Sequence, residues 1–343
     1  MLYGNYLFSS TLKDDAVLPS YKGSTFRGVF GHALKKVVCA LKRQDCQDCL
    51  LRLRCVYPFV FEAQALPDEP KGRKRIASPP HPYAIEPPGG TKTDYKKAEP
   101  FEFTLLLFGK ANDYLPYFIY AFEQMGRLGI GKRIGGKRAG FLLERVTTNG
   151  KRIYSNQDKK LTGGNFVRDL ELQDFAMPED RAVQRVEISL KTPLRLKFEN
   201  KLEASLPFHV LVRAMLRRIS SLANYHGNGE PTLDYRGMVQ RAKAVEITDS
   251  SIKWFDWKRY SNKQDQSMLM GGIVGSVVYS GDLGEFLPLI RFCERVHVGK
   301  QTSFGLGKIE ITTPTLPSPS KGEGLGGGEK RKFLYNELTG TGQ

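Results

Sequence analysis

The sequence predicts an α+β protein built from two consecutive ferredoxin-like (RRM-like) domains, with a four-cysteine metal-binding insertion after the first helix. Two observations predict this class. The order strand, helix, strand, strand, helix, strand occurs twice along the chain, and each half has a glycine-rich basic segment just before its last strand. We therefore expect domains at 1–182 and 183–313, followed by a flexible linker and tail at 314–343.

The first half begins with a segment at 3–12 that predicts a strand. Ser24 and Thr25 then occupy the position of a helix N-cap, and apolar residues follow at helical spacing to about residue 43. A long loop rich in Pro, Lys and Gly spans 66–100 and contains one short extended piece, PYAIEPP. The remaining elements are a strand at 101–110, a helix at 113–126 that ends at glycine, and a strand at 141–148.

The second half repeats this order after a strand at 185–192. Ser205 is expected to cap the next helix, with Pro207 in its first turn and apolar residues at helical spacing through Ile219. Between 314 and 330, eight of 17 residues are Gly or Pro, which is typical of a flexible linker. The remaining elements are two β-like stretches at 244–260 and 267–280, a helix at 282–296 and a closing strand at 308–312.

The charge of the chain favours a polyanionic partner. Its 343 residues include 52 Lys and Arg against 36 Asp and Glu, a formal net charge of +16. Such an excess fits nucleic acid first and an anionic membrane second, and the alternative is a merely basic soluble protein. No run of about 18 apolar residues occurs, and the N-terminus lacks the basic and apolar regions of a signal peptide. We therefore expect a soluble cytoplasmic protein that does not enter a membrane.

Four of the five cysteines lie within 17 residues, in the pattern Cys39-x6-Cys46-x2-Cys49-x5-Cys55. Without export, disulfides are not expected, and clustered cysteines in a cytoplasmic protein indicate metal or redox chemistry. Four thiolates suit a tetrahedral structural zinc, and an iron–sulfur cluster is the second interpretation. Buried cysteines without a ligand are the third. Cys293 lies alone in an apolar helix and is expected in the core.

Two glycine-rich basic segments are expected to hold phosphates. The first, 126–138, has five glycines and five basic residues; the second, 295–308, has three glycines, and neither contains an acid. Glycine lets the backbone approach a phosphate closely, and consecutive N–H groups form an anion-binding nest. Either segment alone could also be a solvated turn. The residues expected to bind RNA here are Arg127, Lys132, Arg133, Lys137, Arg138, His297, Gly299, Lys300, Ser303, Gly305 and Gly307.

Two further segments of the second half combine basic residues in patterns that RNA-binding surfaces use. His209, Arg213 and Arg217 follow one another at intervals of four along one helix. WFDWKRYSNKQ (254–264) interleaves aromatic and basic residues. A solvated helix face and buried tryptophans are the alternative interpretations. The residues expected to contact RNA are Arg213, Arg217, Lys258 and Arg259.

His32 is the candidate general acid or base. It lies away from the apolar stripe of the first helix, it leans over Gly28, and Lys35 and Lys36 are its neighbours at i+3 and i+4. An imidazole beside an ammonium group suits metal-free RNA cleavage, in which the 2′-hydroxyl attacks the adjacent phosphorus. The alternative is a surface histidine with no task.

These motifs resemble those of the CRISPR-associated endoribonucleases of the RAMP superfamily, which cut precursor CRISPR RNA within each repeat. The resemblance covers about residues 1–312 and is most specific at GDLGEFLPLIRFCERVHVGKQTSFGLGKIEI (281–311). It extends to FRGVFGHALKK with the four cysteines after it, LFGKANDYLPYFIYAFEQMGRLGIGK, TPLRLKF, LPFHVLVRAMLRR and WKRYSNKQ.

The resemblance implies tandem ferredoxin-like folds and metal-independent cleavage that leaves a 2′,3′-cyclic phosphate and a 5′-hydroxyl, often with the product retained. It implies a catalytic histidine with a tyrosine or lysine from the first helix or nearby, which maps onto His32 with Lys36 and Tyr21. No cofactor is expected for catalysis, and the zinc is expected to be structural. The implied partners are CRISPR repeat RNA, its crRNA product and other subunits of a CRISPR effector complex.

Two other functions compete with this one. A non-catalytic RAMP subunit would bind guide RNA within an effector complex and leave it uncut. A zinc-dependent regulatory protein would bind DNA, but the chain contains no recognition-helix motif.

Overall fold

The computed structural model describes residues 1–42, 44–62, 79–164, 166–176, 183–196, 205–261 and 266–312, and gives no side chains for 258–261 and 266–269. Three predicted features therefore lie outside the described residues. They are residues 66–78 of the long loop, the boundary between the predicted domains at 182, and the tail at 314–343.

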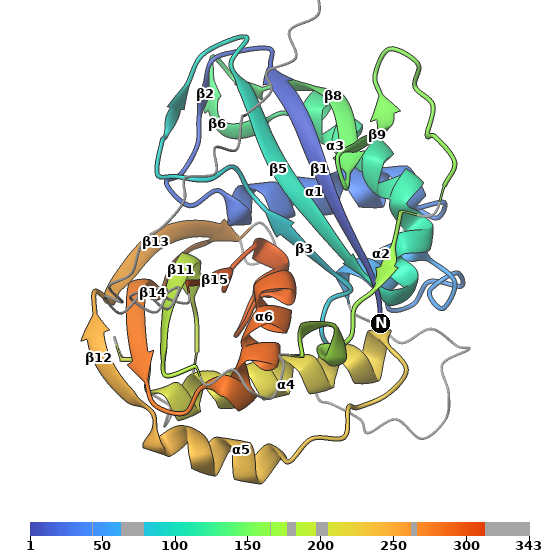
Figure 1. The fold of residues 1–343 in the computed structure, drawn as a ribbon. Coiled ribbons are helices and arrows are strands. Elements are labelled where there is room, and N and C mark those ends of the chain that lie inside the picture. The colour runs from blue at the N-terminus through green and yellow to red at the C-terminus, as the bar shows by residue number, and fades with distance from the viewer. Residues whose placement is uncertain are drawn as a thin grey trace, which may run out of the picture. The chain divides into compact units, whose positions relative to one another are not determined.

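The first half of the chain forms an antiparallel sheet in the order β3-β5-β1-β8-β9, with β10 paired to β1 (Figure 1). Its strands are β1 (Leu2–Leu12), β3 (Tyr83–Glu86), β5 (Pro100–Phe108), β8 (Phe141–Thr148), β9 (Lys151–Ser155) and β10 (Arg168–Asp169). Two small ladders pair β2 (Ala16–Val17) with β4 (Asp94–Tyr95), and β6 (Ile130–Ile134) with β7 (Lys137–Ala139). The helices of this half are α1 (Gly23–Val38), α2 (Val56–Phe61) and α3 (Leu115–Leu128), and the 3-10 helix η1 (Gly109–Tyr114) precedes α3.

The second half forms an antiparallel sheet in the order β12-β14-β11-β15, with β13 paired to β14 (Figure 1). Its strands are β11 (Arg185–Leu194), β12 (Glu246–Ser250), β13 (Lys253–Ser261), β14 (Gln266–Ser280) and β15 (Ile309–Thr312). Its helices are α4 (Phe208–His226), α5 (Tyr235–Arg241) and α6 (Leu287–Val296). The 3-10 helices are η2 (Leu172–Phe175), η3 (Ala242–Ala244), η4 (Gly284–Phe286) and η5 (Thr302–Phe304).

The two sheets repeat one strand order. In each half the first strand, β1 or β11, lies between β5 or β14 on one side and, on the other, the strand that follows the glycine-rich segment, β8 or β15. The edge strand β3 or β12 pairs with that same β5 or β14 strand. The prediction of a mixed α+β protein is therefore confirmed, with antiparallel sheets in both halves.

Apolar periodicity explains which face of each helix is buried. α1 turns Phe26, Phe30 and Ala33 toward the first core. There the Phe30 ring stacks on two rings of α3, with centroids 5.5 Å from Phe118 and 4.7 Å from Phe122. Because burial of one such side chain stabilises the fold by about 1.5–3 kcal/mol, this stripe fixes the rotation of α1 about its axis. The opposite, polar face of α1 is thereby exposed.

The second core lies among α4, α6 and the second sheet, and it includes side chains from the first sheet. Tyr3, Leu106 and Phe108 belong to it together with residues of α4 such as Leu211 and Met215. Since both sheets contribute to one core, residues Met1–Thr313 form one compact unit. No helix in the described ranges is both long enough and apolar enough to span a membrane.

Several predicted helix ends are wrong. α1 begins at Gly23 with Lys22 as its N-cap, so Ser24 lies within the helix, and its hydroxyl is buried without a hydrogen-bond partner in the described structure. α1 also ends at Val38 because Cys39 adopts an extended backbone. α4 begins after Pro207, which is itself the N-cap, so Ser205 does not cap it.

Candidate functional site

α1 presents His32 and Lys36 on its exposed face, one helical turn apart. A Cβ atom at Gly28, one turn before His32, would meet no other heavy atom within 4 Å. An imidazole and an ammonium group therefore border an open space on this helix. The arrangement is the one expected from the sequence, and the catalytic roles of His32 and Lys36 stay predictions.

Arg27, which no sequence pattern singled out, holds α1 against two other segments. Its Nε donates to the Ser303 hydroxyl at 3.1 Å, and its Nη2 lies 3.3 Å from His81 Nε2. The guanidinium lies between two aromatic rings, 4.3 Å from the centroid of Phe61 and 4.4 Å from that of Phe304. Arg27 thus links α1, the segment before β3 and the glycine-rich loop at 297–308. One indication of this role was present in the sequence, since Arg27 is a charged residue among the apolar residues of a predicted helix.

His81 is held as a neutral imidazole. Because the Arg27 guanidinium can only donate, His81 Nε2 accepts from it, and Nδ1 donates to the Val60 carbonyl oxygen at 3.2 Å. Burial, together with the nearby cations Arg27 and Arg218, lowers the pKa of His81 to about 4. Several basic groups therefore meet where α1, the segment before β3 and α4 approach one another.

Tyr21, predicted from the resemblance to be catalytic, lies at this same junction but is buried. Its hydroxyl donates to the Phe304 carbonyl oxygen at 2.6 Å, and its ring packs 5.1 Å from that of Trp257. Burial and the negative charge of Glu86 raise the pKa of Tyr21 above its ordinary range. These contacts give Tyr21 a packing role between the two halves of the chain, and its catalytic role stays a prediction.

The loop at 297–308, which was expected to form an anion-binding nest or a solvated turn, is packed inside the protein, and its binding of RNA stays a prediction. A Cβ atom on Gly305 would lie 2.4 Å from the Ile85 carbonyl oxygen, and one on Gly307 would lie 1.8 Å from that of Val298. Both glycines have positive φ, at 80° and 75°. The close approach that glycine permits here is therefore to the protein's own backbone rather than to phosphate.

Most side chains of this loop are also packed inside the protein. His297 is fully buried and Ser303 is 2% exposed, so neither faces a solvent-borne phosphate. Gly299 is half-buried, with positive φ, close to the Arg195 carbonyl oxygen. Only the side chain of Lys300 is exposed among the loop residues predicted to bind RNA.

His297 instead forms a buried ion-pair cluster between the two halves. Glu86 of β3 accepts from His297 Nε2 at 2.9 Å and from Lys308 Nζ at 2.7 Å. His297 Nδ1 faces the Leu306 carbonyl oxygen at 3.0 Å. Both ring nitrogens therefore face acceptor oxygens. Burial opposes ionisation of Glu86, but His297 and Lys308 outweigh it and lower its pKa to about 2.

The first glycine-rich segment is a β-hairpin rather than a loop. β6 and β7 are joined at Gly135 and Gly136, which have φ of 57° and 82°, the positive values that a tight hairpin turn needs. The basic residues predicted to bind RNA are exposed along it, and none makes an ion pair with another described residue. They are Lys132, Arg133, Lys137 and Arg138, and Arg127 is exposed at the end of α3.

Replacing these four hairpin residues with alanine is expected to weaken binding to RNA. Each lost phosphate contact removes about 0.7 from the slope of log affinity against log salt for a single strand. The measurement is fluorescence anisotropy with labelled RNA over a salt series. A control that exchanges each lysine for arginine and each arginine for lysine keeps the charge and should keep the slope. An unchanged slope in the alanine variant would show that the hairpin faces away from RNA.

The four clustered cysteines lie within the described residues, but their arrangement does not support the predicted metal site. Cys39 follows α1, Cys55 precedes α2, and all four thiols are half-buried and free. Burial raises the pKa of Cys46, and Cys39 and Cys55 raise it further, so the thiols lie near enough to interact. Within the described ranges, however, no three His, Cys, Asp or Glu side chains are arranged to hold a metal ion. The geometry does not support zinc, and the metal stays a prediction.

Elemental analysis of the purified chain tests this prediction. If the thiols of Cys39, Cys46, Cys49 and Cys55 bind zinc, the native protein should contain about one zinc per chain. Cys46→Ser combined with Cys49→Ser should release it and lower the stability, whereas Cys293→Ala should retain it, because Cys293 is buried in the second core. A native protein that contains neither zinc nor iron contradicts the prediction.

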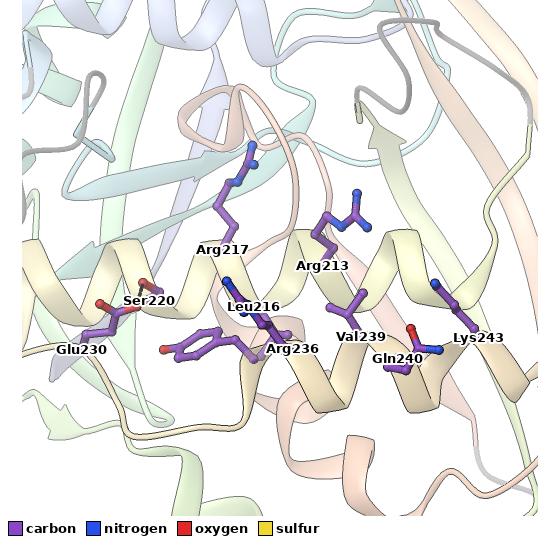
Figure 2. Close-up of a pocket in the computed structure, with 10 residues that line it drawn as sticks. Arg213, Leu216, Arg217, Ser220, Glu230, Arg236, Val239, Gln240 and Lys243 are labelled. Carbon is purple, nitrogen blue, oxygen red and sulfur yellow. Dashed lines mark hydrogen bonds between the residues drawn. The ribbon is translucent and has the colours of Figure 1, made fainter.

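The remaining predicted RNA-binding residues belong to the second half. Arg213 and Arg217 are exposed on one side of α4 and line a groove that α4 forms with α5 (Figure 2). Lys258 and Arg259 lie on β13, but their side chains are outside the described structure. The structure thus brings together Arg213 and Arg217 in one groove.

Two family models match different parts of the chain. A model described as an N-terminal domain matches residues 1–166. The model of the CRISPR-associated endoribonuclease Cas6 matches residues 188–309, which include most of the second sheet and the loop at 297–308. The resemblance to CRISPR RNA-processing proteins is therefore confirmed.

Similar proteins are distant in sequence. An uncharacterized protein of Archaeoglobus fulgidus is 25% identical over 299 residues, which cover 86% of this chain and 92% of that protein. A Cas6 product complex matches with a TM-score of 0.54 and 10% identity, covering 90% of this chain and 100% of that chain. Thermus thermophilus Cas6 matches with a TM-score of 0.51 and 10% identity, covering 91% and 98%. These likenesses show a fold like that of Cas6.

Proposed function

We propose that this Cas6-like chain is an endoribonuclease that binds CRISPR repeat RNA and cuts precursor crRNA within each repeat. The observation that carries the proposal is the match of residues 188–309 to the Cas6 endoribonuclease family. The net charge of +16 and the exposed cations of the β6–β7 hairpin support an RNA partner. Other subunits of a CRISPR effector complex are further partners that this function would involve.

We infer that the chain contains two ferredoxin-like domains, at 1–182 and 183–313. The repeated strand order supports this inference, because each sheet has its first strand in its interior. In addition, α1 and α3 come after β1 and β5, and α4 and α6 come after β11 and β14. The buried contacts of Arg27, Tyr21 and Glu86 would then join the two domains along α1, β3 and the loop at 297–308.

The proposed reaction is a metal-independent transesterification. His32 takes the proton of the 2′-hydroxyl on the nucleotide before the cut, and that oxygen forms a bond to the adjacent phosphorus. The bond from phosphorus to the 5′-oxygen breaks, the leaving oxygen takes a proton from water, and the proton held by His32 passes to the resulting hydroxide. The products carry a 2′,3′-cyclic phosphate and a 5′-hydroxyl. The ammonium of Lys36 offsets the negative charge that develops on the phosphorane.

The geometry of α1 supports these roles for His32 and Lys36. Both side chains are exposed on one face, and the space above Gly28 is open enough for a substrate to approach. Arg27 acts as a positioning residue, since its contacts with Ser303 and His81 hold α1 in place. The reaction needs no metal, so any zinc at the four cysteines would be structural.

Incubation of the purified protein with labelled repeat RNA in EDTA tests the proposal. We expect cleavage at one position per repeat, with a cyclic phosphate at the new 3′-end. A 2′-deoxy substitution at the nucleotide before the cut should abolish cleavage, because it removes the nucleophile. A protein that neither binds nor cuts repeat RNA contradicts the proposal.

The second candidate is a RAMP subunit that binds guide RNA without cutting it. It is favoured by one observation: the match to the Cas6 family covers 188–309, which does not include His32 or Lys36. Tight binding of repeat RNA without any cleavage, in EDTA and in Mg²⁺, would establish this alternative over the first.

A further inference from the structure

α4 and α5 enclose an open groove with a volume of about 610 Å³ (Figure 2). One wall carries Arg213 and Arg217, which project from the same side of α4 one turn apart. The other wall carries Arg236 of α5 and Lys243 of the following η3 turn. The groove is built within the second half of the chain and lies on a different helix from His32.

The groove is strongly positive. Its four cations are all exposed, and none of them forms an ion pair with a carboxylate of the described residues. One carboxylate, Glu230, lies at the edge of the groove, where it accepts from the Ser220 hydroxyl at 2.7 Å. The excess charge extends to the next turn of α4: besides burial, Arg213 and Lys243 lower the pKa of His209. Such a field favours an anionic ligand.

The groove also has an apolar lining, which a free phosphate would not use. Among the residues that line it, Leu216 is buried, and Val239 and Tyr235 are half-buried. The Tyr235 hydroxyl donates to the Pro231 carbonyl oxygen at 3.0 Å, so its ring is held in place. Arginines beside an aromatic and aliphatic surface fit a ligand with both phosphates and planar bases.

We propose that this groove binds a short single-stranded stretch of the RNA substrate, with its phosphates on the four cations and an unstacked base against Leu216, Val239 and Tyr235. A base pair in a duplex keeps its face stacked, so only a single strand can offer that face to the groove. Gln240 also lines the groove and is exposed, so its amide can hydrogen-bond to a base edge. The proposal rests on the proposed function, since it names RNA as the ligand.

The groove contributes to binding and not to the chemical step. No histidine lines it, and the open space above Gly28 belongs to α1 in the first half. Loss of the groove cations should therefore show first as a lower affinity for RNA.

The test compares Arg217→Ala combined with Arg236→Ala against a control that removes two exposed charges from the first sheet, Arg145→Ala with Lys151→Ala. Binding is measured with repeat RNA carrying the 2′-deoxy substitution, so that no cleavage intervenes. We expect the groove variant to bind on the order of tenfold more weakly at 0.1 M salt, with a flatter salt slope, and the control to bind like the wild type. Thermal unfolding of each variant checks that the exposed substitutions leave the fold intact.

Photo-crosslinking locates the contact directly. Repeat RNA with 4-thiouridine at its single-stranded positions should crosslink to peptides of 208–243, and the groove variant should lose this crosslink. Wild-type affinity and slope in the groove variant, with no crosslink to these peptides, would overturn the inference while cleavage by the wild type still supports the proposed function. That result would also follow if an acidic peptide of a partner protein were the ligand. A wild-type protein that neither binds nor cuts repeat RNA would refute both.

Discussion

Replacing His32 with alanine is expected to lower the single-turnover rate of repeat-RNA cleavage by about 10²–10⁴, the usual cost of removing a general acid or base. The affinity for RNA should stay within a fewfold of wild type, because the side chain moves a proton and contributes little binding. The measurement is the cleavage rate at saturating protein, together with the dissociation constant for RNA that carries the 2′-deoxy substitution. Since His32 is on the exposed face of α1, its loss should leave the core unchanged.

Two further variants distinguish the role of His32 in cleavage from the roles of Lys36 and Tyr21. Lys36→Ala should cost less than His32→Ala, because an ammonium group beside the phosphate offsets charge without carrying the proton. Tyr21→Phe keeps the ring beside Trp257 and removes only the hydroxyl and its hydrogen bond to the Phe304 carbonyl oxygen, so its cleavage rate tests the predicted catalytic role of Tyr21 apart from its packing. If His32→Ala cuts at the wild-type rate, the assignment is wrong. A large loss in Tyr21→Phe would then identify Tyr21 as the group that moves the proton.

Replacing Glu86 with alanine is expected to destabilise the protein by about 3–5 kcal/mol, the typical cost of removing one partner of a buried ion pair. The fully buried His297 ring would lose the carboxylate that faces its Nε2, and Lys308 would lose its ion-pair partner. Urea unfolding at neutral pH gives the free energy. Glu86→Gln keeps the volume of the side chain and should cost less than Glu86→Ala. The exposed Glu310→Ala is the control and should cost under about 1 kcal/mol. A loss that small in Glu86→Ala would contradict the prediction.

The ion pairs of Glu86 with His297 and Lys308 make the free energy of unfolding depend on pH in the acid range. The pKa of Glu86 is about 2 in the folded protein against 4.5 for an ordinary glutamate. The stabilisation is therefore complete above about pH 4.5 and is lost as the pH falls toward 2, and it amounts to about 3 kcal/mol. Glu86→Gln should flatten the dependence of unfolding free energy on pH in this window. An equally steep dependence in Glu86→Gln would assign the acid sensitivity to other carboxylates.

Most secondary-structure elements followed from local sequence patterns. The strands β1 and β8 and the helices α1, α3, α4 and α6 lie where alternation or helical spacing of apolar residues predicted them. Their ends were less predictable, because Ser24 and Ser205 resemble N-caps but the structure caps α1 and α4 differently. The face of α1 that carries His32 and Lys36 was predictable as well, since a single apolar stripe fixes which side is buried.

The role of the two glycine-rich segments was not predictable from composition. Both combine glycine with basic residues, yet 126–138 forms an exposed hairpin and 297–308 is packed between β3 and the second core. Glycine permits a tight turn, a close approach to phosphate or a close approach to protein backbone equally well. Which of these occurs depends on the neighbour that the fold supplies.

The sequence by itself determined the α+β class, the basic character of the chain, the resemblance to the RNA-processing family and the exposed face of α1. These properties depend on side-chain type and spacing along one element. The tertiary structure alone decided that Arg27 meets His81 and Ser303, that Glu86 pairs with His297 and Lys308, and that Arg217 faces the same groove as Arg236. Arg27 is separated along the chain from His81 by 54 positions and from Ser303 by 276. Glu86 is separated from both His297 and Lys308 by more than 200 positions. No local pattern encodes such a pairing, because it arises only when both sheets pack on a shared core.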